Sequence, residues 1–114
     1  MKKVLHILFF FLITNQLLAQ KSELANSYFK KGEFSKAVTF YEEFYKEKPF
    51  AQINYPRLIT CYQELKSYQK AEKVIKERIE KYSQYQCYVD LGYNYQLQNN
   101  SAEASKNYEK AISL

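Results

Sequence analysis

The stretch LANSYFKKGEFSKAVTFYEEFYKEKP, from Leu24 to Pro49, decides the fold because its pattern returns twice later in the chain. Leu24, Tyr28 and Ala37 recur 34 residues later, at Leu58, Tyr62 and Ala71. The same pattern appears a third time 33 residues further on, at Leu91, Tyr95 and Ala104. Repeats of about 33 or 34 residues are typical of solenoids, in which each copy packs on its neighbours.

Within the first copy, apolar residues recur at helical spacing and form two amphipathic stripes that are interrupted at Lys31 and Gly32. The chain has only two glycines and two prolines, so it lacks the turn residues that a sheet of many short strands requires. We therefore expect an all-α protein with two helices in each copy. The helices are predicted at residues 21–31 and 35–46, 54–65 and 68–81, and 84–98 and 102–114.

Each pair of helices needs a sharp turn, and Gly32 suits the left-handed backbone conformation with which many helices end. The equivalent positions are Lys66 and Asn99. Asparagine tolerates this conformation, whereas lysine does so less readily. We therefore expect the second turn to be built differently from the other two.

Prolines and asparagines mark further helix ends. Pro56 is tolerated only in a first helical turn, and Asn54 just before it is expected to cap that helix. Asn100 with Glu103 three residues later resembles a capping box, and Pro49 closes the first copy. These signals agree with the helix boundaries that the periodicity predicts.

The pattern resembles the tetratricopeptide repeat, a helix-turn-helix unit of about 34 residues. In that register the first helix of each repeat has four characteristic positions. These are a large residue (Tyr55 and Tyr88), a leucine (Leu24, Leu58 and Leu91), a small residue (Ala25 and Gly92) and a tyrosine (Tyr28, Tyr62 and Tyr95). The second helix supplies an alanine and an aromatic residue, which are Ala37, Ala71 and Ala104, and Tyr41 and Tyr108. The resemblance implies a right-handed α-solenoid of three repeats and six helices, with the repeats at about 21–51, 52–84 and 85–114.

The middle copy departs most from the family pattern. Ile59 stands where a small residue would let two helices approach, and Ile75 replaces an aromatic residue. Arg78 occupies a second small position, and Ser83 stands where the family has a proline. We therefore expect the second repeat to be the least regular.

The first twenty residues, MKKVLHILFFFLITNQLLAQ, have the organisation of a secretory signal peptide. Lys2 and Lys3 precede an apolar run, and Ala19 is a small residue at which a signal peptidase can cut. The competing interpretation is an uncleaved membrane anchor, but the run is interrupted by polar residues at 14–16 and is shorter than the roughly 18 apolar residues that a span needs. No cysteine follows the run, which disfavours a lipoprotein. We expect residues 1–20 to be cleaved, residues 21–114 to form the repeat domain, and the protein to be periplasmic, extracellular or part of the cell envelope.

Charge and composition limit the classes of function that this chain is expected to have. The full chain carries a net charge of +5, and without residues 1–20 the 15 basic and 12 acidic residues leave +3, which is too mild to indicate nucleic acid as a partner. The one histidine, His6, lies in the segment expected to be removed. The sequence has no glycine-rich phosphate loop, no nucleophile paired with a base and no cluster of metal ligands, so neither catalysis nor a cofactor or metal is expected.

Cys61 and Cys87 are the only cysteines. Export would place them where disulfides persist. The repeat register separates them by about seven residues along parallel helices, or ~10 Å, which exceeds the reach of a disulfide. We therefore expect two free thiols in the core.

Proteins of the family bind a partner's peptide or helix in a concave groove that the first helices of successive repeats line. Most tyrosines fall on core positions of the register, and only Tyr82, Tyr85 and Tyr93 do not. The groove positions that the resemblance implies are Asn26, Phe29, Lys30, Arg57, Thr60, Gln63, Glu64, Asp90, Tyr93, Gln96 and Leu97. Some family members grip a C-terminal carboxylate there, but Asp90 would repel that group, so this kind of binding is not expected.

The resemblance therefore implies an exported module that binds or scaffolds a protein or peptide through its concave side. The alternative is the N-terminal assembly domain of a larger bacterial envelope protein whose activity lies beyond residue 114. The chain stops a few residues before a third repeat would finish, without a polar capping helix, so we expect a longer array. If the chain ends there, the open end is expected to self-associate. Membrane contact is expected only through residues 1–20 if they stay uncleaved.

Overall fold

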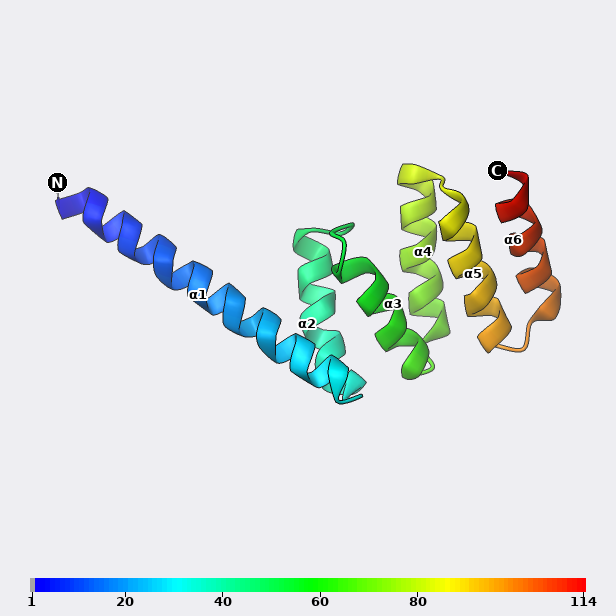
Figure 1. Cartoon of the computed structure of the whole chain (residues 1–114), viewed down its shortest axis with the longest axis horizontal. Helices are drawn as coiled ribbons and strands as arrows, with labels where there is room; N and C mark the ends of the chain where they lie inside the picture. Colours follow the sequence, from blue (N-terminus) through cyan, green and yellow to red (C-terminus); the bar gives the residue numbers. More distant parts are fainter. Residues whose placement is uncertain (1) are drawn as a thin grey trace.

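The computed structural model describes residues 2–114, which contain six α-helices and no strand. The helices are α1 (Lys2–Lys30), α2 (Phe34–Glu47), α3 (Asn54–Glu64), α4 (Tyr68–Tyr82), α5 (Tyr85–Leu97) and α6 (Ser101–Ser113). Each helix packs against the next one along the chain, and α2 to α6 stand in a row (Figure 1). The predicted all-α solenoid is confirmed, and α2 to α6 begin and end within one residue of the predicted bounds.

The first helix is much longer than predicted. It begins at Lys2 instead of residue 21, because no glycine or proline interrupts the chain between the apolar run and the first repeat. Its residues up to Leu24 are exposed, and it projects away from the other helices (Figure 1). By length and composition this helix could cross a membrane. The length argument against an anchor was therefore wrong, and length does not separate an anchor from a signal peptide.

Small residues let the helices approach closely, as the register predicts. Ala25, Ala37 and Ala71 are fully buried. At Gly92, a Cβ atom would lie 2.6 Å from the ring of Tyr108, so the contact between α5 and α6 requires a glycine in this geometry. The packing of helix pairs therefore depends on side-chain size at these positions.

The leucines of the register are not equivalent. Leu58 and Leu91 are buried, with exposed fractions of 1% and 5%, whereas Leu24 is 44% exposed. Leu58 lies beside residues of α2, such as Tyr45, but α1 has no preceding helix among the described residues. The expectation that Leu24 repeats the role of Leu58 was therefore wrong, because the burial of this position depends on the preceding hairpin.

The three turns within the hairpins have the same conformation. Gly32, Lys66 and Asn99 all have positive φ angles, of 75°, 59° and 60°. In each turn the residue after the one with positive φ donates its backbone N–H to the carbonyl five residues earlier. The bonds run from Glu33 to Tyr28, from Ser67 to Tyr62 and from Asn100 to Tyr95. This is the Schellman arrangement. The expectation of a different second turn was wrong, because packing of the hairpin imposes the left-handed conformation on Lys66.

The two asparagines predicted as helix caps behave differently. The Asn100 side chain accepts a hydrogen bond from the Glu103 N–H at 3.3 Å, which confirms that cap. Asn54 is the first residue of α3, and its amide donates at 3.4 Å to the Phe44 carbonyl near the end of α2. Asn54 thus satisfies the end of the preceding helix instead of capping its own.

The core also contains a tyrosine hydroxyl that bonds to a neighbouring helix and two buried thiols. The Tyr95 hydroxyl donates to Glu72 at 2.6 Å and so connects α5 to α4. Burial, with this hydrogen bond and the charge of Glu72, raises the pKa of Tyr95 to about 12. Cys61 and Cys87 are buried free thiols, as predicted, and burial raises the pKa of Cys61 to about 11.

Arg78, which departs from the family pattern, covers an aromatic cluster. Its guanidinium lies 4.5 Å from the ring centre of Tyr55, and 5.6 and 5.3 Å from those of Phe50 and Tyr82. The planar cation therefore fills space over aromatic faces, where it is stabilised by cation–π attraction.

Substitution of Lys66 by glycine tests the shared turn geometry. A non-glycine residue in the left-handed conformation costs about 1 kcal/mol or more, so K66G should raise the free energy of unfolding by about 1 kcal/mol in urea titrations. K66A keeps the strain and is the matched control, with an expected change below about 0.5 kcal/mol. Equal stabilities of K66G and K66A would contradict the assigned conformation.

Candidate protein-binding groove

The helices α1, α3 and α5 line one side of the row, and two pockets open between them. The α1/α3 pocket has a volume of about 350 Å³ and is lined by Ser22, Asn26, Tyr41, Phe44, Ile53, Asn54 and Arg57. The α3/α5 pocket has a volume of about 220 Å³ and is lined by Tyr55, Pro56, Ile59, Thr60, Gln63, Asp90 and Tyr93. Six of the eleven groove residues implied by the resemblance therefore line one of the two pockets.

Arg57 lines the α1/α3 pocket and connects the helices around it. Its Nη1 atom donates at 2.7 Å to Oδ1 of Asn26 on α1 and at 2.7 Å to the hydroxyl of Tyr41 on α2. The guanidinium also lies 4.7 Å from the ring centre of Phe29. Phe29 itself packs edge-on against Phe34 and Tyr41, with ring centres 5.5 and 5.9 Å apart.

These contacts give Arg57 a structural role. Its hydrogen bonds connect α3 to both helices of the first hairpin, and its planar face is stacked on an aromatic ring. A charged donor that is already paired in this way contributes to packing between hairpins. A ligand in the α1/α3 pocket would meet a cation that is already paired with groups of the chain.

The α3/α5 pocket has an acidic group instead. Asp90 on α5 accepts a hydrogen bond from the Tyr55 hydroxyl at 3.2 Å and another from Nε2 of Gln86 at 3.1 Å. Burial raises the pKa of Asp90, and the two hydrogen bonds and the positive charge of Arg78 oppose that effect. The pocket therefore contains a partly buried carboxylate that neutral groups hold in place.

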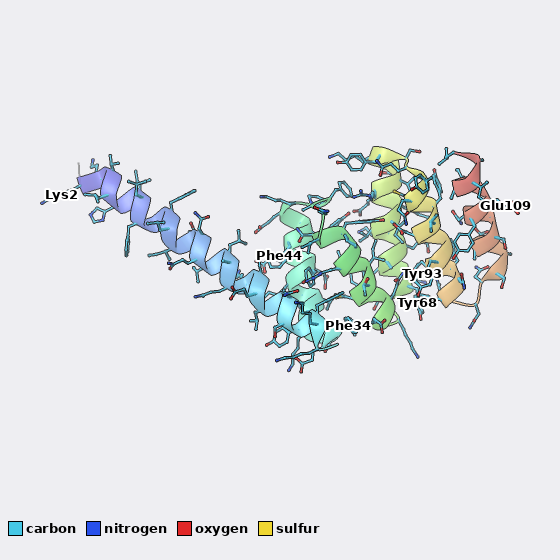
Figure 2. The ribbon with its side chains drawn as sticks, in the orientation of Figure 1. Lys2, Phe34, Phe44, Tyr68, Tyr93 and Glu109 are labelled. Atoms are coloured by element: carbon cyan, nitrogen blue, oxygen red, sulfur yellow. The ribbon has the colours of Figure 1, made fainter. Side chains whose placement is uncertain are left out.

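The other walls of this pocket are apolar or weakly polar. The Thr60 hydroxyl donates to the Pro56 carbonyl at 3.0 Å, so its side chain is fixed against α3. Gln63 donates to Oδ1 of Asn94 at 3.3 Å. Tyr93 projects from α5 with 48% of its surface exposed (Figure 2). Tyr93 is thus the large aromatic residue of the pocket that remains open to solvent.

Five groove residues lie outside both pockets: Phe29, which packs against Arg57, and four others. Lys30 and Glu64 are exposed near the ends of α1 and α3. Gln96 accepts a hydrogen bond from the Tyr108 hydroxyl at 2.7 Å, which directs it toward α6, and Leu97 is half-buried. The structure therefore does not bring these four residues into one site.

Asn94 makes buried contacts between helices that the sequence pattern did not identify. It is fully buried, and its amide donates at 2.9 Å to the Tyr68 carbonyl at the start of α4. Through Gln63 it also connects α5 to α3. Its equivalents, Ser27 and Cys61, are small and do not suggest a buried amide. The only sequence feature that pointed to Asn94 is that a larger amide residue stands at a repeat position where the other two copies have small residues.

The described residues 2–114 contain no group of three or more His, Cys, Asp and Glu side chains that could hold a metal ion. What the two pockets offer is aromatic surface, amide and hydroxyl groups and charge. These groups suit the recognition of another molecule's side chains.

Comparison with known proteins gives one family. A family model described as Tetratricopeptide repeat matches residues 22–50 and 85–114, which correspond to the first and third hairpins. The unmatched middle hairpin is the one that carries Ile59, Ile75 and Arg78. No curated protein matches the chain.

Replacement of Arg57 by methionine tests its structural role. R57M leaves the Asn26 and Tyr41 oxygens without their donor, so the free energy of unfolding should fall by about 1–3 kcal/mol. K30M removes an exposed cation on the same side and should change stability by less than about 0.5 kcal/mol. Urea unfolding followed by circular dichroism measures both, and an R57M variant as stable as K30M would refute the role.

Proposed function

Because this chain belongs to the tetratricopeptide repeat family, we propose that it binds a protein partner through the groove that α1, α3 and α5 line. Repeats of this family generally mediate protein–protein interaction or scaffolding, so the fold itself is an interaction module. The observation that carries the proposal is the α3/α5 pocket, where Tyr93 is half exposed beside a partly buried carboxylate. Exposed aromatic residues at the edge of a pocket are common anchors of interfaces.

The two inter-helix pockets are unequal as binding sites. Arg57 lines the α1/α3 pocket and is already paired by hydrogen bonds within the chain. Asp90, in the α3/α5 pocket, has no salt bridge to any of the other described residues. A partner that lies along the groove would therefore gain most at the α3/α5 pocket. The groove residues that we assign to the contact are Thr60, Gln63, Asp90 and Tyr93.

We also propose that the protein acts outside the cytoplasm, in the periplasm or cell envelope. Two lysines and an exposed apolar segment at the start of α1 support export, and Ala19 supports cleavage. Lys2 lies at the end of α1 farthest from the hairpins (Figure 2). An uncleaved α1 would hold the hairpins at a membrane surface, and N-terminal sequencing of the purified protein distinguishes the two forms.

Substitution of Tyr93 tests binding in the groove. The immobilised protein should capture a discrete partner from a cell-envelope extract, and Y93A should reduce that capture about tenfold or more, as for a buried aromatic anchor. Y85A is the matched control, because Tyr85 is an exposed tyrosine on the same helix that lies outside the pocket. Equal capture by Y93A and the unsubstituted protein would remove the groove from the proposal.

A role in assembly is the second candidate, and the ends of the row favour it. Ile112 on α6 is 86% exposed, whereas its equivalents Tyr45 and Ile79 are partly buried beside a following hairpin. Leu24 is the exposed counterpart at the opposite end. These faces would suit further helices or a second copy of the chain.

Sedimentation velocity at increasing protein concentration tests the assembly role. Stacking through α6 should give species larger than a monomer, and I112E should abolish them, because a buried carboxylate without a partner is unfavourable. I112E should leave partner capture unchanged, since Ile112 lies outside the groove. A monomer at every concentration would contradict assembly by this chain.

A further inference from the structure

We propose that the α3/α5 pocket receives a cationic side chain, a lysine or arginine, of the bound protein. The proposal rests on the function proposed above and names the chemical class that its main pocket recognises. It follows from a comparison of two sites that occupy equivalent places in successive hairpins.

The first of these sites already contains a cation. Arg57 reaches from α3 to Asn26 on α1 and stacks over Phe29. An amide oxygen and an aromatic face thus hold a guanidinium between two neighbouring first helices. The chain itself shows that this place in the fold accommodates such a group.

In the α3/α5 pocket a negatively charged residue stands at the position that Arg57 occupies in the α1/α3 pocket. Asp90 lies one repeat after Arg57 and occupies the equivalent position on α5, and Thr60 is the equivalent of Asn26. The residues that line the α3/α5 pocket include one acid and no base. The second site therefore has a negative charge where the first has its own positive charge.

Asp90 can accept further hydrogen bonds. One of its oxygens accepts from Tyr55 and the other from Gln86, and both donors are neutral. A carboxylate has about four acceptor positions, so these two bonds leave room for a ligand. None of the three salt bridges in residues 2–114 includes Asp90.

The nearest cation that could compete is Arg78. It lines an adjoining pocket on the other side of Asp90, of about 310 Å³, together with Tyr55 and Phe50. Its guanidinium is stacked 4.5 Å from the ring centre of Tyr55. Arg78 is therefore held over the aromatic cluster and leaves the Tyr93 side of Asp90 open.

The remaining walls match the rest of a basic side chain. Pro56 and Ile59 form an apolar surface that suits the methylene groups of lysine or arginine. Tyr93 adds an exposed aromatic face near the carboxylate. A carboxylate beside an aromatic ring favours a cation through charge and cation–π attraction.

Nuclear magnetic resonance titration of the full chain in a neutral detergent tests the proposal. The probes are N-acetyl-arginine methylamide and its citrulline analogue, which has nearly the same shape but no charge. The arginine probe should shift the amide signals of Thr60, Asp90 and Tyr93 and bind about fivefold or more tightly than the citrulline probe. The lysine derivative should behave like the arginine probe.

Substitution of Asp90 provides the specificity test. D90N keeps the side-chain shape and removes the negative charge: its Oδ1 can accept from Gln86, and its Nδ2 can donate to the Tyr55 hydroxyl oxygen in place of the bond that Asp90 accepts. It should abolish the preference for arginine over citrulline. E64Q removes an exposed acid of the groove that lies outside the pocket and should preserve the preference. Circular dichroism of both variants checks that their helical content is unchanged.

Two results would overturn the proposal. One is equal binding of the arginine and citrulline probes, and the other is a charge-dependent shift centred on Arg78 and Phe50 instead of Tyr93. If Y93A abolishes partner capture while the two probes bind equally, the groove binds protein without a cationic anchor. If the arginine preference is present while Y93A does not affect capture, the pocket assignment holds and the proposed groove function fails.

Discussion

The structure depends on the burial of helix faces against neighbouring helices, because buried residues of the first two hairpins and Leu91 of the third form one hydrophobic core. Very small residues are buried at Ala25, Ala37 and Ala71, and at Gly92 the ring of Tyr108 leaves no room for a Cβ atom. Each of the three hairpins contains at least one of these residues. Larger side chains at these positions would separate the helices and remove apolar contacts along the whole row.

The same geometry fixes the groove. Because successive hairpins stack with one register, residues that are one repeat apart occupy equivalent places between neighbouring first helices. Arg57 and Asp90 form such a pair, and they give the two inter-helix sites opposite charge. The backbone thus repeats, whereas the chemistry of each site depends on a few side chains. On the function proposed here, specificity arises from those exceptions to the repeat.

Periodicity predicted the six helices, the buried alanines and the free thiols, because these features follow from local spacing and residue size. The sequence misled where the environment of a residue decided its conformation. Lys66 adopts a left-handed turn that its own preferences disfavour, and Leu24 is exposed because no helix precedes α1 in the described chain. Arg57 was predicted to face a partner, but its hydrogen bonds to Asn26 and Tyr41 could not be read from one sequence.

Hydrogen exchange of individual amides in a Leu58→Ala variant tests the central claim most directly. Leu58 is 1% exposed in α3, at the junction of the first two hairpins. If neighbouring hairpins stabilise one another, the variant should lose about 2–5 kcal/mol of protection in α2, α3, α4 and α5 alike. A loss confined to α3 and α4, with α2 and α5 unchanged, would show that the hairpins fold independently and would contradict the account.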